Sequence, residues 1–328
     1  MKQESTTLIE LNRDEIKNVM QEKGEYRTDD VLIKKWDSES ADSDQFLAEI
    51  NKGYSKFLGV LNNSFDRDGY GYYSFENGDR YLGSFKNDKR NYNGFYIWPS
   101  TKKDRNVLTE SYSGFFTDNI KDKSGIYMWL DEPEDNNDFD EANFIAYVGE
   151  IEDGTYKRGT LLQKNGEKYH LYHGNFDKNG KKNDDNGYFY SSQLDRLFHG
   201  KIVNDKFVSG YVAFFDSDEG VLENITFCEY GENNEILSAK IYDQFNEEEK
   251  EREINDNTLF RNIILGVDYF GTIYNNHKDI YRWLEADCGS LDIFEDKEKF
   301  PNLMKLLVNY NKNNVYSDIE EKQFGRKV

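Results

Sequence analysis

The stretch YLGSFKNDKRNYNGFYIW, residues 81–98, decides how this chain folds, because it twice places glycine between aromatic residues at the spacing of a β-strand. Tyr81, Gly83 and Phe85 are two residues apart, and residues 94–98 repeat the arrangement after a polar gap. Side chains two apart in a strand lie on the same face. The pattern therefore predicts two strands, each with an aromatic face interrupted by a glycine.

Glycine at these positions leaves a slot into which an aromatic ring can pack. Without side chains, Gly83 and Gly94 allow a ring to lie flat over the bare backbone. Burying an aromatic side chain stabilises a fold by about 1.5 to 3 kcal/mol, whereas glycine inside a strand costs about 0.5 to 1 kcal/mol. We infer that the exchange favours folding.

The same pattern occurs six times, which predicts an array of β-hairpins. The first segments are FLGVL (57–61), YLGSF (81–85), YSGFF (112–116), YVGEI (147–151), YHGNF (172–176) and FHGKI (198–202). The second segments are GYYSF (71–75), GFYIW (94–98), GIYMW (125–129), GTLL (159–162), GYFY (187–190) and GYVAF (210–214). Polar residues separate the two segments, so each unit is expected to be a hairpin with a medium-length loop. One hairpin cannot bury its rings alone, but stacked hairpins can.

Ten glycines are expected to have this structural role. They are Gly59, Gly83, Gly94, Gly114, Gly125, Gly149, Gly174, Gly187, Gly200 and Gly210.

This pattern, Y-x-G-x-[F/I] followed by G-x-[Y/F]-x-[W/F], resembles the MORN repeat (membrane occupation and recognition nexus). The resemblance covers residues 54–215, about half of the chain. Three features depart from the family pattern, and the first is the longer spacers at residues 99–110 and 131–143. A G-x-G before the second strand survives only at residues 69–71, and the fourth unit has Leu161 and Leu162 where an aromatic residue is usual.

The six repeats predict a mainly β fold in which consecutive hairpins form an elongated, single-layer antiparallel sheet. The helical spacing of apolar residues in both flanks predicts helices that cap this sheet. The expected parts are an N-terminal helical cap at 1–53 with helices at 5–24 and 41–50, six hairpin repeats at 54–215, a degenerate last hairpin at 216–245, and a C-terminal helical cap or interaction domain at 246–328 with helices near 254–270, 277–287 and 301–311.

Composition limits the partners of the chain. The net charge of -21 argues against nucleic acid and anionic lipid as main partners. No signal-peptide segment and no run of about 18 apolar residues is present, so we expect a cytoplasmic protein without a transmembrane segment. Local basic clusters at Lys86, Lys89 and Arg90, at 102–105 and at 178–182 keep membrane contact as an alternative.

No catalytic or metal-binding motif stands out. His170 and His173 are three apart on a predicted strand, and His173 and His199 are two strands apart, so neither pair is placed to share a metal; we expect exposed histidines. No phosphate-binding loop or nucleophile motif occurs. We therefore predict that the chain is not an enzyme and has no metal, cofactor or small-molecule substrate.

The predicted function is that of a non-catalytic scaffold or assembly subunit that binds other protein subunits. Similar repeat proteins without an enzyme domain include radial-spoke head proteins of cilia and cytoskeletal proteins of protists, so the expected setting is the ciliary axoneme or the cytoskeleton. The alternatives are a peripheral tether that binds anionic phospholipid and an accessory subunit of an organellar complex.

An aromatic groove is the candidate surface for partners. Its residues are Tyr81, Tyr96, Trp98, Tyr112, Tyr127 and Trp129. The alternative is that these rings pack only on each other.

Overall fold

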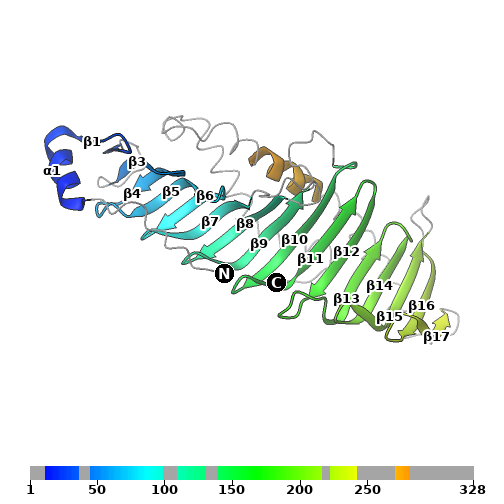
Figure 1. Ribbon diagram of the computed structural model, residues 1–328. Helices are drawn as coiled ribbons and strands as arrows, with labels where there is room; N and C mark the ends of the chain where they lie inside the picture. Colours follow the sequence, from blue (N-terminus) through cyan, green and yellow to red (C-terminus); the bar gives the residue numbers. More distant parts are fainter. Residues whose placement is uncertain are drawn as a thin grey trace. The chain divides into compact units, whose positions relative to one another are not determined.

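The computed structural model describes residues 12–36, 45–98, 109–130, 139–215, 222–241 and 270–280. Seventeen strands form one open antiparallel sheet in which successive strands pair, with helices at residues 13–23 and 270–280 (Figure 1). The predicted mainly β architecture of consecutive hairpins in a single sheet is confirmed.

The segments of the six repeats lie on strands, except that Phe75 and Phe176 each follow the last residue of a strand. The helix and strands are α1 (Arg13–Lys23), β1 (Glu25–Arg27), β2 (Val31–Lys35), β3 (Phe46–Lys52), β4 (Ser55–Leu61), β5 (Arg67–Ser74), β6 (Arg80–Lys86), β7 (Lys89–Trp98), β8 (Thr109–Thr117), β9 (Ile120–Leu130), β10 (Asn143–Glu152), β11 (Thr155–Asn165), β12 (Lys168–Asn175), β13 (Asp184–Ser191), β14 (Arg196–Val203), β15 (Lys206–Phe215), β16 (Leu222–Tyr230) and β17 (Ile236–Ile241).

The chain divides into two compact units. Among the described residues, the first unit holds α1, β1 to β8 and the start of β9 up to Lys121. The second unit holds β9 from Asp122, β10 to β17 and residues 270–278.

The repeat glycines lie opposite one another across the strands. In the first unit, Gly83 pairs with Gly94, which pairs with Gly114 on its other side. In the second unit, Gly149 lies between Gly125 and Gly159 in the same way. The remaining pairs of this kind are Gly59 with Gly71, Gly71 with Gly83, Gly159 with Gly174, Gly187 with Gly200 and Gly200 with Gly210.

The ring of Tyr81 packs on one of these glycine pairs. A Cβ atom added to Gly83 would lie 2.6 Å from Oη of Tyr81 and 2.7 Å from the carbonyl oxygen of Asn93, and one added to Gly94 would also meet this ring. No methyl group fits at such distances. We call the face that carries these glycines and rings the ring face.

The hydroxyl groups of these tyrosines satisfy carbonyl groups at β-bulges. Register slips between Gly83 and Phe85, so Ser84 has no partner in β7, and its carbonyl accepts a hydrogen bond of 2.8 Å from Tyr81 Oη. Tyr147 donates to the carbonyl of Glu150, 2.7 Å away, at the corresponding bulge in β10. Tyrosine at this position therefore has two roles. Its ring fills the space above the glycines, and its hydroxyl donates a hydrogen bond to a backbone carbonyl that has no partner in the neighbouring strand.

In four of the six repeats the hairpin connection is tighter than the predicted medium-length loop, whereas residues 62–66 and 176–183 form longer connections in the first and fifth repeats. β6 and β7 are joined by Asn87 and Asp88, whose φ angles of 48° and 64° fit a two-residue turn with left-handed residues. The turns at 118–119, 153–154 and 204–205 are of the same length. The predicted loops are too long because the strands continue past the motif into the polar residues of the spacer.

Two positions keep a glycine-like backbone without glycine. Gly69, two residues before Gly71, has a φ of 114°. Tyr92 and Lys123, two residues before the second-strand glycines of their own units, have φ angles of 60° and 64°. The bulge is thus preserved where the G-x-G pattern is lost, at a cost of about 1 to 2 kcal/mol for each residue.

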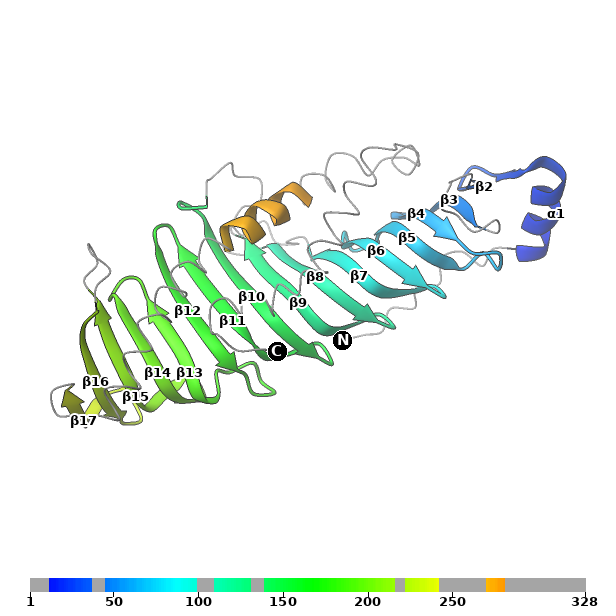
Figure 2. The same ribbon diagram turned by 180° about the vertical axis from the view of Figure 1, so that it is seen from behind.

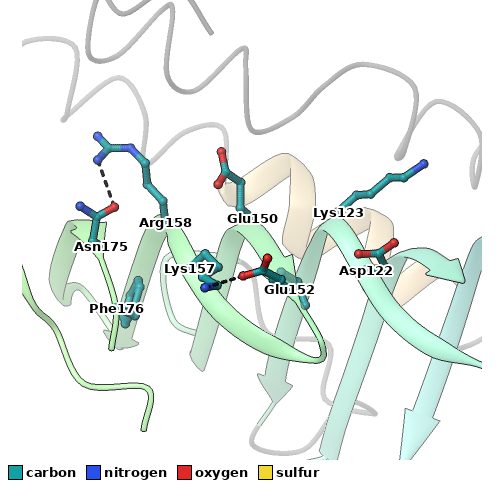
Figure 3. Close-up of a pocket in the computed structure, with 9 residues that line it drawn as sticks. Asp122, Lys123, Glu150, Glu152, Lys157, Arg158, Asn175 and Phe176 are labelled. Atoms are coloured by element: carbon teal, nitrogen blue, oxygen red, sulfur yellow. Dashed lines mark hydrogen bonds and ion pairs between the residues drawn. The ribbon is translucent and has the colours of Figure 1, made fainter. Parts of the chain in front are cut away.

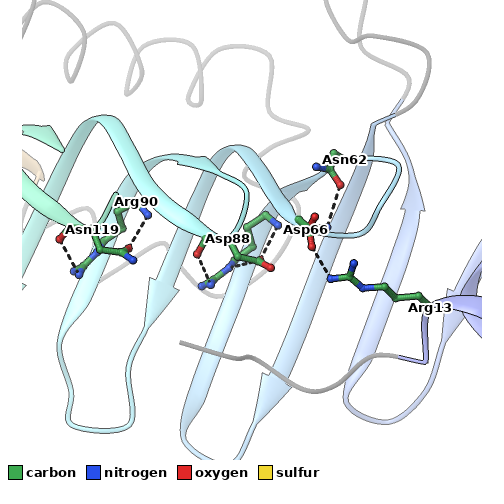
Figure 4. A network of polar contacts seen from close by, with 7 residues as sticks. Arg13, Asn62, Asp66, Asp88, Arg90 and Asn119 are labelled. Atoms are coloured by element: carbon green, nitrogen blue, oxygen red, sulfur yellow. Dashed lines mark hydrogen bonds and ion pairs between the residues drawn. The ribbon is translucent and has the colours of Figure 1, made fainter. Parts of the chain in front are cut away.

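Turn residues connect the second and third hairpins to the hairpin that precedes each (Figure 4). Asp88 accepts hydrogen bonds from the backbone N–H and Nε of Arg67, at 2.9 and 3.0 Å. Asn119 accepts from the same two groups of Arg90, at 2.8 and 3.3 Å. These contacts fix the spacing of successive repeats.

The N-terminal flank differs in part from the prediction. α1 has Asn12 as its N-cap and ends at Gly24, which has a φ of 72°; residues 5–11 of the predicted helix lie outside the described residues. The helix predicted at 41–50 is wrong for residues 46–50, which belong to β3. Pairing of Leu47 with Val60 and Ala48 with Gly59 overrides any local helical preference. β1 and β2 likewise lie inside the range 1–53 that we expected to be helical.

The C-terminal flank contains a hairpin and a helix. β16 and β17 pair around a turn at 231–235, in the range expected for a degenerate hairpin. The helix at 270–280 lies beside β10 (Figure 2), where Tyr274 stacks on Phe144 at 5.1 Å between ring centroids. Phe144 is three residues from Tyr147 and so lies on the face opposite the ring face. The helix predicted at 277–287 overlaps the observed helix at residues 277–280. Residues 281–287, the helix predicted at 301–311 and the part of 254–270 before Phe270 fall outside the described residues.

Replacing Gly83 with alanine is expected to lower the free energy of unfolding by about 3 kcal/mol, because the new Cβ meets backbone atoms that cannot move away cheaply. Gly271→Ala is the matched control: its Cβ would be 3.5 Å from the Phe139 ring in a helix, where alanine gains about 1 kcal/mol. Urea unfolding measures both. A loss below about 1 kcal/mol for Gly83→Ala would contradict the packing account.

Replacing Tyr81 with phenylalanine is expected to cost about 1.5 kcal/mol, because the carbonyl of Ser84 loses its buried donor. Tyr73→Phe is the control, since Tyr73 is also buried but its hydroxyl makes no hydrogen bond within the described part of the chain. Thermal and urea unfolding of the two variants should differ. Equal stability of both would show that the hydroxyl of Tyr81 contributes nothing.

Candidate partner-binding surface

The structure separates the six residues of the predicted groove into two classes. Tyr81 and Tyr112 are fully buried, and Tyr96 and Tyr127 are 5% and 4% exposed. Trp98 and Trp129 are half-buried. The four tyrosines therefore pack within the protein, as the alternative supposed, and only the two tryptophans present a ring to solvent.

A covering side chain lies over the first-strand ring in every repeat. Arg90 illustrates the arrangement: its guanidinium carbon is 5.9 Å from the ring centroid of Tyr81 and 4.9 Å from that of Tyr96. The covering residues and their rings are Arg67 on Phe57, Arg90 on Tyr81, Lys121 on Tyr112, Tyr156 on Tyr147, Lys182 on Tyr172 and Phe207 on Phe198. The covering residue is a cation in four repeats and an aromatic side chain in two. The ring is held between this residue and a pair of facing glycines at Phe57, Tyr81, Tyr147 and Phe198.

In the first unit, the phenylalanine two positions after the first-strand glycine links neighbouring repeats. Phe85 meets the rings of Phe57 and Tyr81 edge-on, at 5.7 and 5.1 Å. Phe116 meets Tyr81 and Tyr112 in the same way, at 5.4 and 5.2 Å. The aromatic stack is therefore continuous along the first unit. Edge-to-face pairs of this kind stabilise by about 0.5 to 1.5 kcal/mol each.

Trp98 lies in a cluster of charged groups in the first unit. Its ring packs on Tyr96 at a tilt of 36°, with centroids 4.3 Å apart, and Nζ of Lys121 is also 4.3 Å from its ring centroid. Glu110 is opposite Trp98 in β8. Tyr96 donates a hydrogen bond of 2.7 Å to Asp79.

Burial shifts the protonation equilibria of this cluster. Burial lowers the pKa of Lys121 to about 8. The negative charge of Glu110 raises this pKa in part, and the positive charge of Arg90 lowers it further. Burial also raises the pKa of Glu110, with Asp79 adding to the effect. Perturbed pKa values gathered around a half-buried tryptophan mark this cluster as a candidate binding site.

Trp129 has a different setting in the second unit. It stacks on Tyr127 with an interplanar angle of 11° and meets Tyr156 edge-on at 6.4 Å. Ile145 is its partner in β10. This surface is aromatic and apolar, in contrast to the charged surroundings of Trp98.

A shallow depression of about 670 Å³ lies at the strand ends of the second unit (Figure 3). Its lining contains Asp122, Lys123, Glu150, Ile151, Glu152, Lys157, Arg158, Asn175 and Phe176. Glu152 pairs with Lys157, and Arg158 donates to Asn175 at 3.3 Å. Acidic and basic side chains are equal in number, so the depression has no charge preference for a ligand.

The histidines occupy different environments from those predicted. His173 is fully buried rather than exposed, with Nδ1 3.0 Å from the hydroxyl of Thr160. Tyr188 lies between it and His199, whose ring stacks on Tyr188 at 4.2 Å. The cause is strand register, which places Thr160 beside His173 and which the sequence alone does not give.

Sequence reasoning missed the covering residues because they lie in the polar spacer. A signal was present, since Arg67, Arg90 and Lys121 each precede a second-strand glycine by four residues.

Within the described ranges, no three histidine, cysteine or acidic residues gather as a metal site. No helix in this part of the chain has the length and apolar character to cross a bilayer. No known protein family and no curated protein matches the sequence.

The lowered pKa of Lys121 predicts a pH dependence of stability. Its charged form is disfavoured in the folded state, so this penalty is complete below the folded pKa of about 8 and disappears as pH rises toward the unfolded value of 10.5. We therefore expect the wild type to gain stability relative to Lys121→Met between about pH 7 and about pH 9.5. Urea unfolding of both proteins at both pH values measures this difference, and an unchanged difference would contradict it.

Proposed function

We propose that this chain is a non-catalytic scaffold or assembly subunit that binds protein partners through the ring face. The observation that carries the proposal is the partial exposure of Trp98 and Trp129 next to rings that are buried. Tryptophan is enriched among the residues that contribute most to protein–protein binding. The buried stack beneath each tryptophan holds its ring in place before a partner arrives, which reduces the entropic cost of binding.

The proposed setting is the ciliary axoneme or the cytoskeleton, and the resemblance to MORN repeats is its only support. The tether and organellar alternatives have the same status.

The basic clusters that would favour a phospholipid tether are largely engaged within the protein. Arg90 covers Tyr81, Lys89 pairs with Asp118 at 3.1 Å, and Lys182 lies 3.7 Å from Asp205. The cluster at 102–105 lies outside the described residues. Sedimentation with anionic vesicles at physiological salt is the direct test, and strong binding would overturn a function limited to protein partners.

Trp98→Ala and Trp129→Ala are expected to keep the fold and to release the protein from its native complex, because half-buried rings contribute less to stability than buried ones. The size of the complex that holds the tagged chain in its source cell, together with the thermal midpoint of each purified variant, is the measurement. Tyr112→Ala is the control that should unfold, since Tyr112 is fully buried. Folded variants that remain in the complex would contradict the proposal.

A further inference from the structure

A row of four polar side chains crosses the ring face of the second unit near the strand ends, and we call it the polar row. Gln163 in β11 pairs with His170 in β12, which pairs on its other side with Ser191 in β13. Ser191 in turn pairs with Arg196 in β14. Each of the four is four residues from the repeat glycine of its strand, the same separation as Trp129 from its own, so all four lie on the ring face.

The two central side chains of the row hold buried polar atoms without a hydrogen-bond partner. Ser191 is 2% exposed, and its hydroxyl oxygen makes no hydrogen bond within the described residues. Nδ1 of His170 is also buried and has no partner in this part of the chain, while the ring lies 5.7 Å from that of Phe189. A buried polar atom without a partner costs about 1 to 3 kcal/mol. A ligand that bonds to both atoms would recover this cost.

Positive charge flanks these two atoms on the same face. Arg196 is exposed, and its guanidinium carbon lies 4.8 Å from the ring centroid of Phe214. Within the described ranges this guanidinium makes no hydrogen bond or ion pair. Lys168, two residues before His170, is exposed on the ring face too. The exposed amide of Gln163 completes a set of donors at this place.

The acidic groups of the two adjoining turns act on side chains of the other face. Asp195 accepts a hydrogen bond of 3.4 Å from Tyr190, which alternates to that face. Burial lowers the pKa of Lys164, also on that face, and the charges of Asp140 and Glu167 raise it in part. The net charge of the chain opposes an anion only weakly here, because dissolved salt screens charges beyond about 8 to 10 Å. The local charge therefore favours an anion.

We propose that the polar row binds an oxyanion, a carboxylate or phosphoryl group, on a side chain of a partner protein. Arg196 pairs with two oxygens of the anion, as guanidinium groups commonly do. The hydroxyl of Ser191 and Nδ1 of His170 donate to the remaining oxygens, which gives both buried atoms the partner that they lack. This inference rests on the proposed scaffold function and names the chemistry of one partner.

The test uses the full chain with 13C-labelled histidine rings, titrated at constant ionic strength with inorganic phosphate or with acetate. The ring signals of His170 are identified by their loss in His170→Gln. We expect them to shift saturably, whereas those of His199, which follows Phe198 and so lies on the other face, stay in place. A response to phosphate alone supports a phosphoryl ligand, and a response to both anions supports a carboxylate.

Variants of matched charge separate the site from general attraction. Arg196→Gln should weaken anion binding at least about tenfold. Ser191→Ala should weaken it about fivefold without lowering the thermal midpoint, because it removes a buried hydroxyl that has no partner in the free protein. Lys206→Gln removes the same charge as Arg196→Gln at the end of β15 far from Phe214, and should leave binding unchanged. Thermal midpoints show that each variant is folded.

Two results would overturn the proposal. One is the absence of a saturable shift of the His170 signals with either anion. The other is a loss of binding in Lys206→Gln as large as that in Arg196→Gln, which would mean attraction by net charge alone. Either result leaves the scaffold function intact if the tryptophan variants are still released from the native complex, so the two failures can be told apart.

Discussion

Tyr81 lies so close to the backbone of Gly83 and Gly94 that a methyl group on either glycine would collide with its ring. This contact determines the register of the sheet as well as its packing. A slip of one residue between β6 and β7 would place a side chain under the ring and turn the aromatic residues to the other face. Glycine lies opposite glycine on neighbouring strands within each unit, so the same constraint on register is repeated from strand to strand.

The covering residues complete this arrangement, and some of the basic side chains of the protein are used in this way. Arg67 and Arg90 are held by the turn residues of the following hairpin while their guanidinium groups lie over rings. These cations serve the core, where contact with an aromatic face contributes about 0.5 to 2 kcal/mol. Arg67 is buried, so this cation does not add to the basic surface of a chain that has 63 acidic and 42 basic residues.

The sequence predicted the hairpin array because alternation and glycine spacing are local signals that six copies reinforce. It did not predict β3, which lacks the motif and is a strand because of its pairing with β2 and β4. The covering residues were missed for a related reason: Arg90 lies in a polar spacer, and only the register brings it over Tyr81. The prediction therefore succeeded where a residue's role depends on its near neighbours in sequence and failed where it depends on a neighbouring strand.

The same distinction locates the candidate binding residues. Tyr96 is two residues beyond Gly94, where the ring of Tyr81 and the guanidinium of Arg90 enclose it. Trp98 is four residues beyond the glycine, at the last residue of β7, where the stack has fewer neighbours and the ring remains half-buried. Packing restricts which side chain fits at a position close to the glycine pair, whereas a position at the strand end accepts different side chains. Differences between repeats, such as the charges around Trp98 and the apolar surface around Trp129, therefore lie at the strand ends, where a partner could distinguish one repeat from another.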